Sequence, residues 1–351
     1  MAAALALGRR GLGSTWPNPS VGCVIVKDGR VVGRGATRPG GRPHAEAEAL
    51  ARAGERARGA TAYVTLEPCA HHGTTPPCAD ALIAAGVART VLALRDPNPE
   101  ARGGAERLRA AGVAVAEGVL GARARRDQAG FLSRVERGRP WLTLKLATSF
   151  DGRIATASGE SRWITGPAAR RLVHAERLRH DAVMVGGGTA RADDPSLTVR
   201  GLGAVRQPVR VVMSRGLDLD PAGVLGRTAR DVPVWLVHSG ADAAPWRTTG
   251  ARLLEAAEGP GGLDPRAALR ALGGAGLTRV FCEGGGRLAA SLLRAGVVDE
   301  LVGFTAGVAL GCEGWPGLGP LGLDSLAAAP RLHLLESRPV GEDVMHRWRA
   351  G

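Results

Sequence analysis

The sequence predicts an α/β protein with two domains. Segments rich in Val, Ile and Leu alternate with segments of helix-forming Ala, Leu and Arg, and Gly or Pro separates many of them. This alternation predicts mostly parallel sheets whose strands are connected by helices. A length of 351 residues exceeds what one hydrophobic core usually serves. Because Gly138-Arg139-Pro140 interrupts the pattern, we expect one domain over residues 1–138 and a second over 139–351.

The first half is expected to form one sheet with its connecting helices. Asp28-Gly29 lies between two β-rich runs and predicts a hairpin, and Gly54 is placed to end a helix that begins at His44. In this layout His44 and Cys78 both lie at helix N-termini at the mouth of a sheet, where open α/β sheets place their sites. The expected elements are a short helix at the start, strands over 21–26 and 30–34, a helix over 44–53, a strand over 61–66, a helix over 78–85, strands over 89–94 and 116–119, and a basic helix over 121–139.

The second half repeats the alternation with a different set of segments. Pro167 suits the first turn of a helix. Glycine triplets at 186–188 and 284–286 follow strands, and such glycines let backbone N–H groups approach a phosphate, although ordinary turns are the alternative. The expected elements are a strand over 141–147, a helix over 167–180, strands over 182–185, 209–213 and 234–238, a helix over 264–272, a strand over 278–282, a helix over 287–295, a strand over 300–305, an irregular Gly/Pro region and a closing strand over 344–348.

The first half also carries a candidate catalytic zinc site. His44 is followed by Glu46 after one residue, and Cys69 and Cys78 come later in the chain. One imidazole and two thiolates suit zinc, and three protein ligands leave a fourth position for water. The order H-x-E and then P-C is typical of zinc deaminases, in which the Glu carries a proton from the water to the leaving ammonia. The alternative is a structural zinc closed by His71 or His72, which leaves Glu46 without a role.

Composition excludes several other classes of function. The formal net charge is +13, but the basic residues are scattered Arg, aromatic residues are only 3%, and no basic tail is present, so we do not expect nucleic-acid binding. There is no apolar run long enough for a membrane span. Five cysteines, two of them candidate ligands, fit a reducing cytoplasm better than a disulfide framework. Lys27 and Lys145 are the only lysines among 46 basic residues. Lys145 is therefore a candidate functional residue, and the alternative is that a lysine was kept there by chance.

The first half contains four longer motifs, which are Pro17–Val26 (PNPSVGCVIV), Pro43–Glu46 (PHAE), Thr65–Cys78 (TLEPCAHHGTTPPC) and Asp96–Pro99 (DPNP). These motifs resemble the bifunctional riboflavin-biosynthesis deaminase–reductase family. The eight residues between the two cysteines are typical of that family, whereas base and nucleoside deaminases usually have two.

Three motifs of the second half resemble the reductase part of the same family. They are Lys145–Arg153 (KLATSFDGR), Trp163–Thr165 (WIT) and Asp193–Arg200 (DDPSLTVR). The resemblance thus covers essentially the whole chain. It implies a cytidine-deaminase-like three-layer domain followed by a dihydrofolate-reductase-like domain.

The resemblance also implies two reactions and their cofactors. Zn²⁺ bound by His44, Cys69 and Cys78 would support deamination of 2,5-diamino-6-(5-phosphoribosylamino)pyrimidin-4-one, with Glu46 as the catalytic acid and base. NADPH would then reduce 5-amino-6-(5-phosphoribosylamino)uracil to the ribitylamino product. The implied partner is this small phosphoribosyl pyrimidine rather than nucleic acid or a membrane, and a homo-oligomer is expected. The residues implied to contact the deaminase substrate are Asn18, His72 and Asp96.

The same resemblance implies the reductase site. Lys145 and Glu283 are the candidate proton donors, and Arg215 stands where the family has Ser and is a candidate partner of the NADPH 2′-phosphate. From pattern alone, Arg177 and Arg200 would be solvated surface charges. Trp163 would be a core residue as readily as a residue that contacts the cofactor. NADPH is expected against Ala147, Trp163, Thr189, Asp193, Gly285, Gly286, Arg287, Leu288, Ala289, Ala290 and Ser291, and the substrate against Ser161, Arg177, Leu197, Arg200 and Glu283.

Two other functions remain open at this point. The first is a deaminase of nucleosides or tRNA that carries a nucleotide-binding regulatory domain. The second is a zinc-stabilised nucleotide-binding protein without catalysis. The cysteine spacing and the paired glycine triplets speak against the first, and an intact Glu46 speaks against the second.

Overall fold

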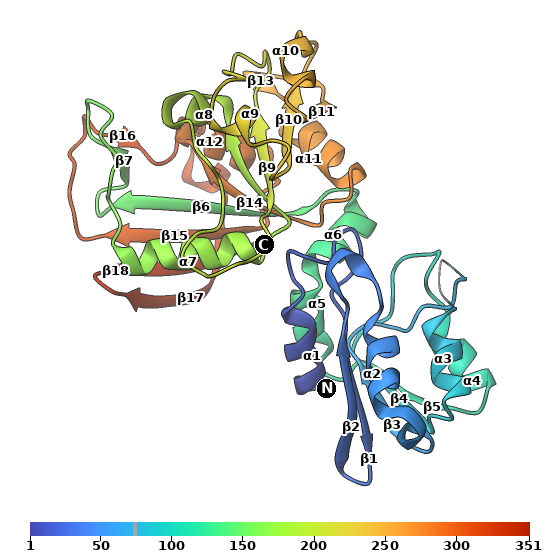
Figure 1. The fold of residues 1–351 in the computed structure, drawn as a ribbon. Helices are drawn as coiled ribbons and strands as arrows, with labels where there is room; N and C mark the ends of the chain where they lie inside the picture. Colours follow the sequence, from blue (N-terminus) through green and yellow to red (C-terminus); the bar gives the residue numbers. More distant parts are fainter. Residues whose placement is uncertain (73–75) are drawn as a thin grey trace. The chain divides into compact units, whose positions relative to one another are not determined.

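The computed structural model describes residues 1–72 and 76–351, and the chain forms two compact units, Met1–Gly138 and Arg139–Gly351 (Figure 1). Each unit is built around one large sheet. None of the helices in the described residues is long and apolar enough to cross a lipid bilayer.

The first unit contains a five-stranded mixed sheet in the order β2-β1-β3-β4-β5. β1 pairs antiparallel with β2 and with β3, whereas β3, β4 and β5 pair in parallel. Asp28 and Gly29, both at positive φ, form the predicted tight turn between the first two strands. The strands are β1 (Gly22–Lys27), β2 (Arg30–Ala36), β3 (Thr61–Val64), β4 (Arg89–Leu92) and β5 (Ala114–Ala116).

Helices cover both faces of this sheet, as the predicted three-layer arrangement requires. Figure 1 shows α1 and α5 on one side of the sheet and α2, α3 and α4 on the other. They are α1 (Ala2–Arg9), α2 (Ala45–Ala53), α3 (Cys78–Ala84), α4 (Gly104–Ala110), α5 (Gly121–Asp127) and α6 (Ala129–Arg137), with short 3₁₀ turns η1 (Pro39–Gly41) and η2 (Gly54–Ala57).

Close packing of α2 against β2 determines where the candidate zinc site lies. A Cβ atom added at Gly33 would lie 2.2 Å from the carbonyl oxygen of Ala49, and one added at Gly35 would lie 2.2 Å from that of Ala45. Only glycine therefore permits this separation between helix and strand. The N-terminal end of α2, which carries the candidate site, is held directly against the sheet.

The predicted helix over 121–139 is wrong in one respect, because it is two helices. The chain leaves helical geometry at Gln128, whose φ and ψ are −91° and 7°. The buried Gln128 side chain donates a hydrogen bond to the carbonyl oxygen of Ser20 at 2.7 Å. A tertiary contact thus accompanies the break, and helix propensity could not reveal it.

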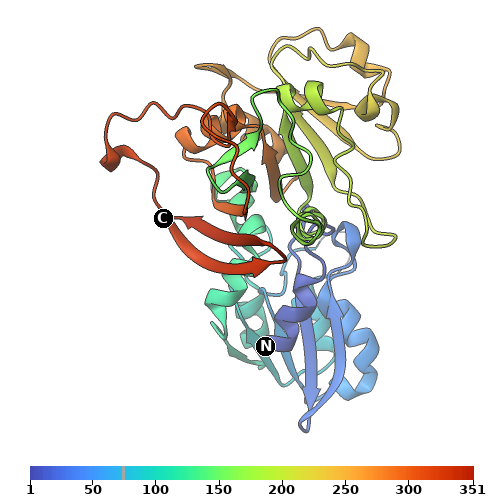
Figure 2. The ribbon, with the colours of Figure 1, turned by 90° about the vertical axis from the view of Figure 1, so that its left-hand side faces the viewer.

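The second unit contains a nine-stranded sheet in the order β11-β10-β9-β8-β14-β6-β15-β18-β17. The pairs from β11 to β15 are parallel, and β18 pairs antiparallel with β15 and β17. Figure 2 shows the β17–β18 hairpin, drawn in red, which forms one edge of this sheet. The strands are β6 (Trp141–Ser149), β8 (Ala182–Gly186), β9 (Val209–Met213), β10 (Val234–His238), β11 (Arg252–Glu255), β14 (Arg279–Gly284), β15 (Glu300–Ala306), β17 (Leu332–Val340) and β18 (Asp343–Ala350).

The helices of this unit pack on the sheet through apolar side chains. Ala169, Leu172 and Val173 of α7 pack against Val302 and Phe304 of β15. The remaining elements are α7 (Pro167–Leu178), α8 (Gly187–Asp193), α9 (Val224–Arg227), α10 (Ala244–Arg247), α11 (Pro265–Gly274), α12 (Gly286–Arg294), η3 (Leu326–Ala328), and two small sheets, one of β7 (Arg153–Ala155) with β16 (Trp315–Pro316) and one of β12 (Glu258–Gly259) with β13 (Gly262–Leu263).

Most predicted elements of the second half are present, with two corrections. The expected irregular region before the last strand contains β17, whose side chains are mostly exposed and therefore show no alternating apolar pattern. The glycine triplet at 186–188 is not a free loop, because α8 begins at Gly187. The α/β class with mostly parallel pairing in this unit is confirmed.

Candidate functional site

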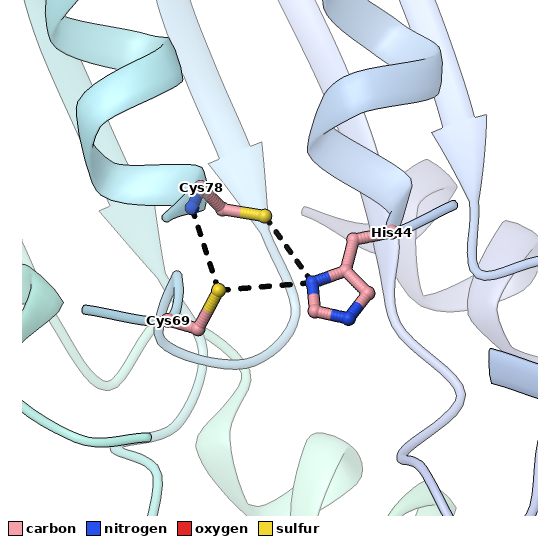
Figure 3. A group of neighbouring side chains, drawn as sticks. All are labelled: His44, Cys69 and Cys78. Atoms are coloured by element: carbon pink, nitrogen blue, oxygen red, sulfur yellow. Dashed lines mark hydrogen bonds between the residues drawn. The ribbon is translucent and has the colours of Figure 1, made fainter. Parts of the chain in front are cut away.

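Three candidate zinc ligands from separate segments meet in the first unit. His44 directly precedes α2, Cys78 is the first residue of α3, and Cys69 lies between β3 and α3. The Nδ1 atom of His44 lies 3.3 Å from Sγ of Cys78 and 3.7 Å from Sγ of Cys69, as Figure 3 shows. Zinc bonds of about 2.0 Å to nitrogen and about 2.3 Å to sulfur, at tetrahedral angles, place such ligands about 3.5 Å apart. The three atoms therefore fit one zinc ion.

Hydrogen bonds prepare one of the two sulfurs to bind a cation. Sγ of Cys69 accepts a hydrogen bond from the backbone N–H of Cys78 at 3.4 Å. Hydrogen bonding with the side chain of Cys78 lowers the pKa of Cys69 to about 4. Cys69 is therefore a thiolate at neutral pH, and the thiolate is the form that binds metals.

The described geometry leaves the fourth zinc position without a protein ligand. Across residues 1–72 and 76–351, no further His, Cys, Asp or Glu joins the group of His44, Cys69 and Cys78. His72 is 73% exposed, and its Nε2 atom lies 4.0 Å from a carboxylate oxygen of Asp80. This geometry does not support a structural zinc closed by a fourth described side chain. An open position is typical of catalytic zinc.

Glu46 lies in the first turn of α2, next to these ligands, and is 3% exposed. Burial raises the pKa of Glu46 to about 7, against the opposing charge of His44 and a hydrogen bond with the Cys78 side chain. A carboxyl group with this pKa binds and releases a proton near neutral pH, as general acid–base catalysis requires.

Two of the predicted substrate residues of this half flank the same region. Asn18 packs against Gly41, where an added Cβ would lie 2.0 Å from the Asn18 Nδ2 atom. Asp96 is 7% exposed, and its Oδ1 atom accepts a hydrogen bond from the Asn98 N–H at 2.9 Å. Burial raises the pKa of Asp96 to about 6.

The third predicted substrate residue, His72, has an exposed side chain whose Nε2 atom lies 4.0 Å from Asp80. The neighbouring His71 is better placed. Its Nδ1 atom is buried and has no hydrogen-bond partner among the residues that the structure describes. Charge interactions also link His71 to Asp96. Adjacent histidines in a loop give no sequence signal of which one turns inward.

Sequence reasoning also missed Glu67, which holds the loop that carries Asp96. The Glu67 carboxylate is nearly fully buried and accepts hydrogen bonds from the N–H groups of Asp96 at 3.0 Å, Gly103 at 3.2 Å and Ala105 at 2.9 Å. An added Cβ at Gly104 would lie 1.8 Å from the carbonyl oxygen of Pro68. The loop before α4 is thus fixed against the segment that contains Cys69.

In the second unit, Lys145 and Glu283 come together on neighbouring strands. Cys282 of β14 pairs with Leu144 of β6, so that Glu283 and Lys145, the next residues, lie side by side. Arg177 of α7 binds Glu283 through two contacts, Nε to Oε1 at 2.5 Å and Nη2 to Oε2 at 2.8 Å. The Arg177 and Glu283 side chains are 11% and 13% exposed, so Arg177 is not a solvated surface charge.

The charges in this group shift one another's protonation. Burial alone would raise the pKa of Glu283, but the Arg177 guanidinium outweighs it and holds the pKa below its usual value. Burial lowers the pKa of Lys145, although Glu283 opposes this effect. Glu283 is therefore a carboxylate, while Lys145 gives up its proton more readily than an exposed lysine does.

The other predicted substrate residues lie at the ends of nearby segments. Ser161 is exposed in the loop before α7. Leu197 is 3% exposed, so its backbone rather than its side chain is available to a ligand. Arg200 is exposed, and its backbone N–H donates a hydrogen bond to Nδ1 of His174 at 3.2 Å. His174 lies one turn before Arg177 on α7 and was missed by sequence reasoning.

The predicted NADPH residues Trp163, Thr189 and Ala147 lie on three different segments of the second unit, the loop before α7, helix α8 and strand β6. Trp163 is 66% exposed with the Arg170 guanidinium 4.6 Å above its ring, so the alternative of a core tryptophan is wrong. The Thr189 hydroxyl of α8 donates to the carbonyl oxygen of Gly284 at 3.3 Å, and an added Cβ at Gly285 would lie 2.7 Å from that hydroxyl. Ala147 is half-buried on β6, two residues beyond Lys145.

The remaining predicted cofactor residues differ in exposure and in the element on which they lie. Asp193 is the last residue of α8 and is exposed. Arg215 is exposed just after β9, 3.7 Å from the Glu258 carboxylate. The stretch Gly285–Ser291 is not a continuous loop, because α12 starts at Gly286 and buries Ala289 and Ala290. Backbone groups at the start of α12 are thus the part of this stretch that a cofactor can reach.

Comparison with known proteins agrees with this arrangement. Residues 1–94 match the cytidine and deoxycytidylate deaminase zinc-binding region, and residues 140–346 match the RibD C-terminal domain. The chain is 45% identical to the riboflavin biosynthesis protein RibD of Escherichia coli over 98% of this chain and 96% of that protein. It is 39% identical to RibD of Aquifex aeolicus, again over 98% and 96% of the two chains.

Solved structures give the same result. The Acinetobacter baumannii RibD structure has a TM-score of 0.91 at 38% identity and covers 100% of this chain and 98% of its own. A Thermotoga maritima structure described as a diaminohydroxyphosphoribosylaminopyrimidine deaminase/5-amino-6-(5-phosphoribosylamino)uracil reductase has a TM-score of 0.88 at 33% identity, covering 100% and 97% of the two chains.

The predicted fold class, a deaminase domain followed by a reductase domain, and zinc and NADPH as cofactors are confirmed by these matches. A deaminase of a single activity with a regulatory domain is not favoured, because the second half matches a reductase domain over almost its full length. The chain belongs to the RibD family of enzymes, which join a zinc-dependent deaminase to a reductase in riboflavin biosynthesis.

Proposed function

We propose that this enzyme deaminates 2,5-diamino-6-(5-phosphoribosylamino)pyrimidin-4-one and then reduces 5-amino-6-(5-phosphoribosylamino)uracil with NADPH. The observation that carries the proposal is the open site of His44, Cys69 and Cys78 with buried Glu46 beside it. The Lys145–Glu283–Arg177 group in the second unit supports the reductive step.

For deamination, His44, Cys69 and Cys78 would hold a zinc ion, which when bound would lower the pKa of a water molecule to about 7 and so activate it for attack on the ring carbon. Glu46 takes the proton of the attacking water and delivers it to the amino group that leaves as ammonia. Asn18 and Asp96 hold the pyrimidine in this proposal, together with His71 in place of the predicted His72.

For reduction, bound NADPH would supply a hydride for C1′ of the ribosyl group, and the ring oxygen that departs from C1′ would need a proton. We assign this proton to Lys145, because burial weakens its hold on the proton. Glu283 is not the donor, since Arg177 keeps it ionised. Its role is to orient the Lys145 ammonium. Arg200 binds the substrate phosphate, because its guanidinium has no hydrogen bond or ion pair elsewhere in the described residues.

One experiment tests both reactions together. Purified protein is analysed for zinc and supplied with the diaminopyrimidine substrate and NADPH, and ammonia release and NADPH oxidation are followed. We expect about one zinc per chain. Ammonia release should not need NADPH, whereas NADPH oxidation should start only after deamination or with pre-deaminated substrate. Deamination by metal-free protein at the full rate would contradict the proposal.

Arg215 is proposed to bind the 2′-phosphate of NADPH. It lies two residues after the end of β9 at Met213 and is exposed, and its carbonyl oxygen accepts a hydrogen bond from the backbone N–H of Ser239 after the neighbouring β10. Arg215→Ala should reduce the preference for NADPH over NADH roughly tenfold, as loss of a charge-assisted hydrogen bond predicts. The measurement is the ratio of kcat/KM for the two cofactors, with Arg230→Ala as the control. An unchanged ratio would exclude Arg215 from the site.

We also propose that the chain forms a homo-oligomer through β17. This strand ends the nine-stranded sheet, and in the described residues no strand pairs with its outer edge. Exposed apolar edges of this kind favour pairing with another chain. Antiparallel pairing of two copies about Ser337 would place Glu336 of each copy opposite Arg338 of the other. Leu334 and Leu335, 54% and 46% exposed, would then be covered.

Sedimentation equilibrium tests this interface. The wild-type chain should be at least dimeric, and Leu335→Glu should shift it toward the monomer. Val31→Glu changes another exposed apolar strand residue, which is 52% exposed on β2, and should not alter the mass. A monomeric wild type would overturn the oligomer proposal.

We place the enzyme in the cytoplasm, and we propose no nucleic-acid partner. All five cysteines are free, as in a reducing compartment. Several arginines are engaged in ion pairs within the chain, such as Arg95 with Glu117 and Arg347 with Glu176, which does not suit a basic nucleic-acid surface.

A further inference from the structure

The segment Asp194–Arg200 joins α8 to the loop before β9 and belongs to no helix or strand. It contains Leu197 and Arg200, two of the proposed substrate residues. Without a ladder partner, its backbone groups need other hydrogen-bond partners where they are buried. What holds this segment therefore decides where the Arg200 guanidinium lies.

Two residues of the segment adopt a backbone conformation that costs free energy. Asp194 has φ of 37° and Leu197 has φ of 52°, in the left-handed region that disfavours residues other than glycine. Such conformations persist where the surrounding structure enforces them, and they cluster at functional sites. The segment is thus held in a shape that it would not adopt alone.

Three side chains and one backbone N–H from outside the segment supply that constraint. The Thr198 carbonyl oxygen accepts from Nη1 of Arg177 at 2.6 Å, and the Arg200 N–H donates to Nδ1 of His174 at 3.2 Å. The donor Arg177 and the acceptor His174 both belong to α7 and lie about one turn apart. Buried Arg210, which is 1% exposed, donates to the Ser196 carbonyl oxygen at 3.4 Å, and the Asp194 carboxylate accepts from the Val224 N–H at 2.8 Å.

Gln207 binds Val199, the residue between Thr198 and Arg200, which are the two residues in contact with α7. Its Oε1 atom accepts from the Val199 N–H at 2.7 Å, and its Nε2 atom donates to the Val199 carbonyl oxygen at 3.2 Å. One carboxamide thus takes the place of a neighbouring strand for both backbone groups of Val199. The next residue is Arg200, so the direction of its side chain depends on this pair of hydrogen bonds.

The held segment is also electrostatically connected to the reacting group. His174 interacts with Arg177, Arg200 and Glu283, and Lys145 interacts with Glu283 and Arg177. A line of ionisable side chains therefore runs from Lys145 through Glu283, Arg177 and His174 to Arg200. A phosphate bound at Arg200 would keep the sugar of the substrate at a fixed distance from Lys145.

We propose that Gln207 is a positioning residue of the reductase: through Val199 it fixes the backbone at Arg200 and so orients the Arg200 guanidinium toward the phosphate of the substrate. This inference rests on the proposed function, in which Arg200 binds that phosphate. Gln207 itself touches neither substrate nor cofactor.

A double-mutant cycle tests the proposal with pre-deaminated substrate and saturating NADPH. Gln207→Leu, of similar volume, removes both hydrogen bonds and should raise KM for the phosphorylated substrate roughly tenfold with little change in kcat. Arg200→Ala should raise the same KM by a larger factor. In the Arg200→Ala background, Gln207→Leu should add nothing, because it acts through Arg200.

The dephosphorylated ribosyl substrate separates positioning from general damage to the fold. Gln207→Leu and wild type should have the same KM for it, the same KM for NADPH and the same deaminase rate. If Gln207→Leu does not fold, Gln207→Glu replaces it, since it keeps the acceptor for the Val199 N–H and loses only the donor.

Each contrary outcome identifies what is wrong. If Arg200→Ala leaves KM for the phosphorylated substrate unchanged, the phosphate assignment of the proposed function fails, and the positioning role with it. If Arg200→Ala raises KM but Gln207→Leu does not, only the positioning role fails. An effect of Gln207→Leu that persists in full beside Arg200→Ala, or that is equal for the dephosphorylated substrate, also overturns it.

Discussion

Glu46→Gln is expected to lower kcat for deamination roughly a thousandfold, within the range that general acid–base groups contribute. The amide keeps the shape of the buried side chain but cannot carry the proton from water to the leaving ammonia. His44, Cys69 and Cys78 are unchanged, so zinc content should remain at the wild-type level. Reduction of pre-deaminated substrate should also be unaffected, because its residues belong to the other unit.

The control for this prediction is Glu48→Gln on the same helix. Glu48 contacts Arg38 and Arg52 at 3.0 Å and lies outside the zinc site, so deamination should continue. Ammonia release by Glu46→Gln near the wild-type rate, with zinc still bound, would show that another group moves the proton.

Arg177→Met should remove most reductase activity and destabilise the second unit. The change leaves the buried Glu283 carboxylate without its guanidinium partner and releases the Thr198 carbonyl oxygen. Removing one partner of a buried ion pair lowers the free energy of unfolding by about 3 kcal/mol or more. With Glu283 and Lys145 no longer held, we expect kcat/KM for reduction to fall roughly a hundredfold or more.

Chemical denaturation and steady-state kinetics measure these two effects. Arg171→Met changes an exposed arginine on the same helix and should alter neither quantity. The deaminase rate serves as the internal standard for both variants. Full reductase activity in Arg177→Met would mean that Glu283 needs no fixed partner, and it would contradict the roles assigned to this group.

The zinc site could be predicted from sequence because its information is local. The ligand types and the H-x-E order define metal chemistry without reference to the fold, and three short segments carry all of it. Most strands and helices could be predicted for a similar reason, since apolar periodicity and Gly or Pro boundaries act over a few residues. The break at Gln128 could not, because it accompanies a contact with Ser20 far away in the chain.

The partners of the reductase residues were beyond sequence reasoning. Arg177 looked like one more arginine in an arginine-rich chain until the fold placed it against Glu283, 106 positions later. The proposal of His71 in place of His72 depends on burial within one loop, since Nδ1 of His71 is buried whereas the His72 side chain is exposed. Gln207 and His174 carried no motif at all.

The sequence by itself determined the α/β class, the candidate metal ligands, the candidate proton carrier and the family to which the chain is similar, because these depend on residue type and short spacing. Only the tertiary structure decided which charges are buried together, which side chain holds the segment before Arg200, and which histidine of the loop has a buried ring nitrogen. Burial and hydrogen bonding between distant segments set those outcomes, and neither is encoded in a local pattern.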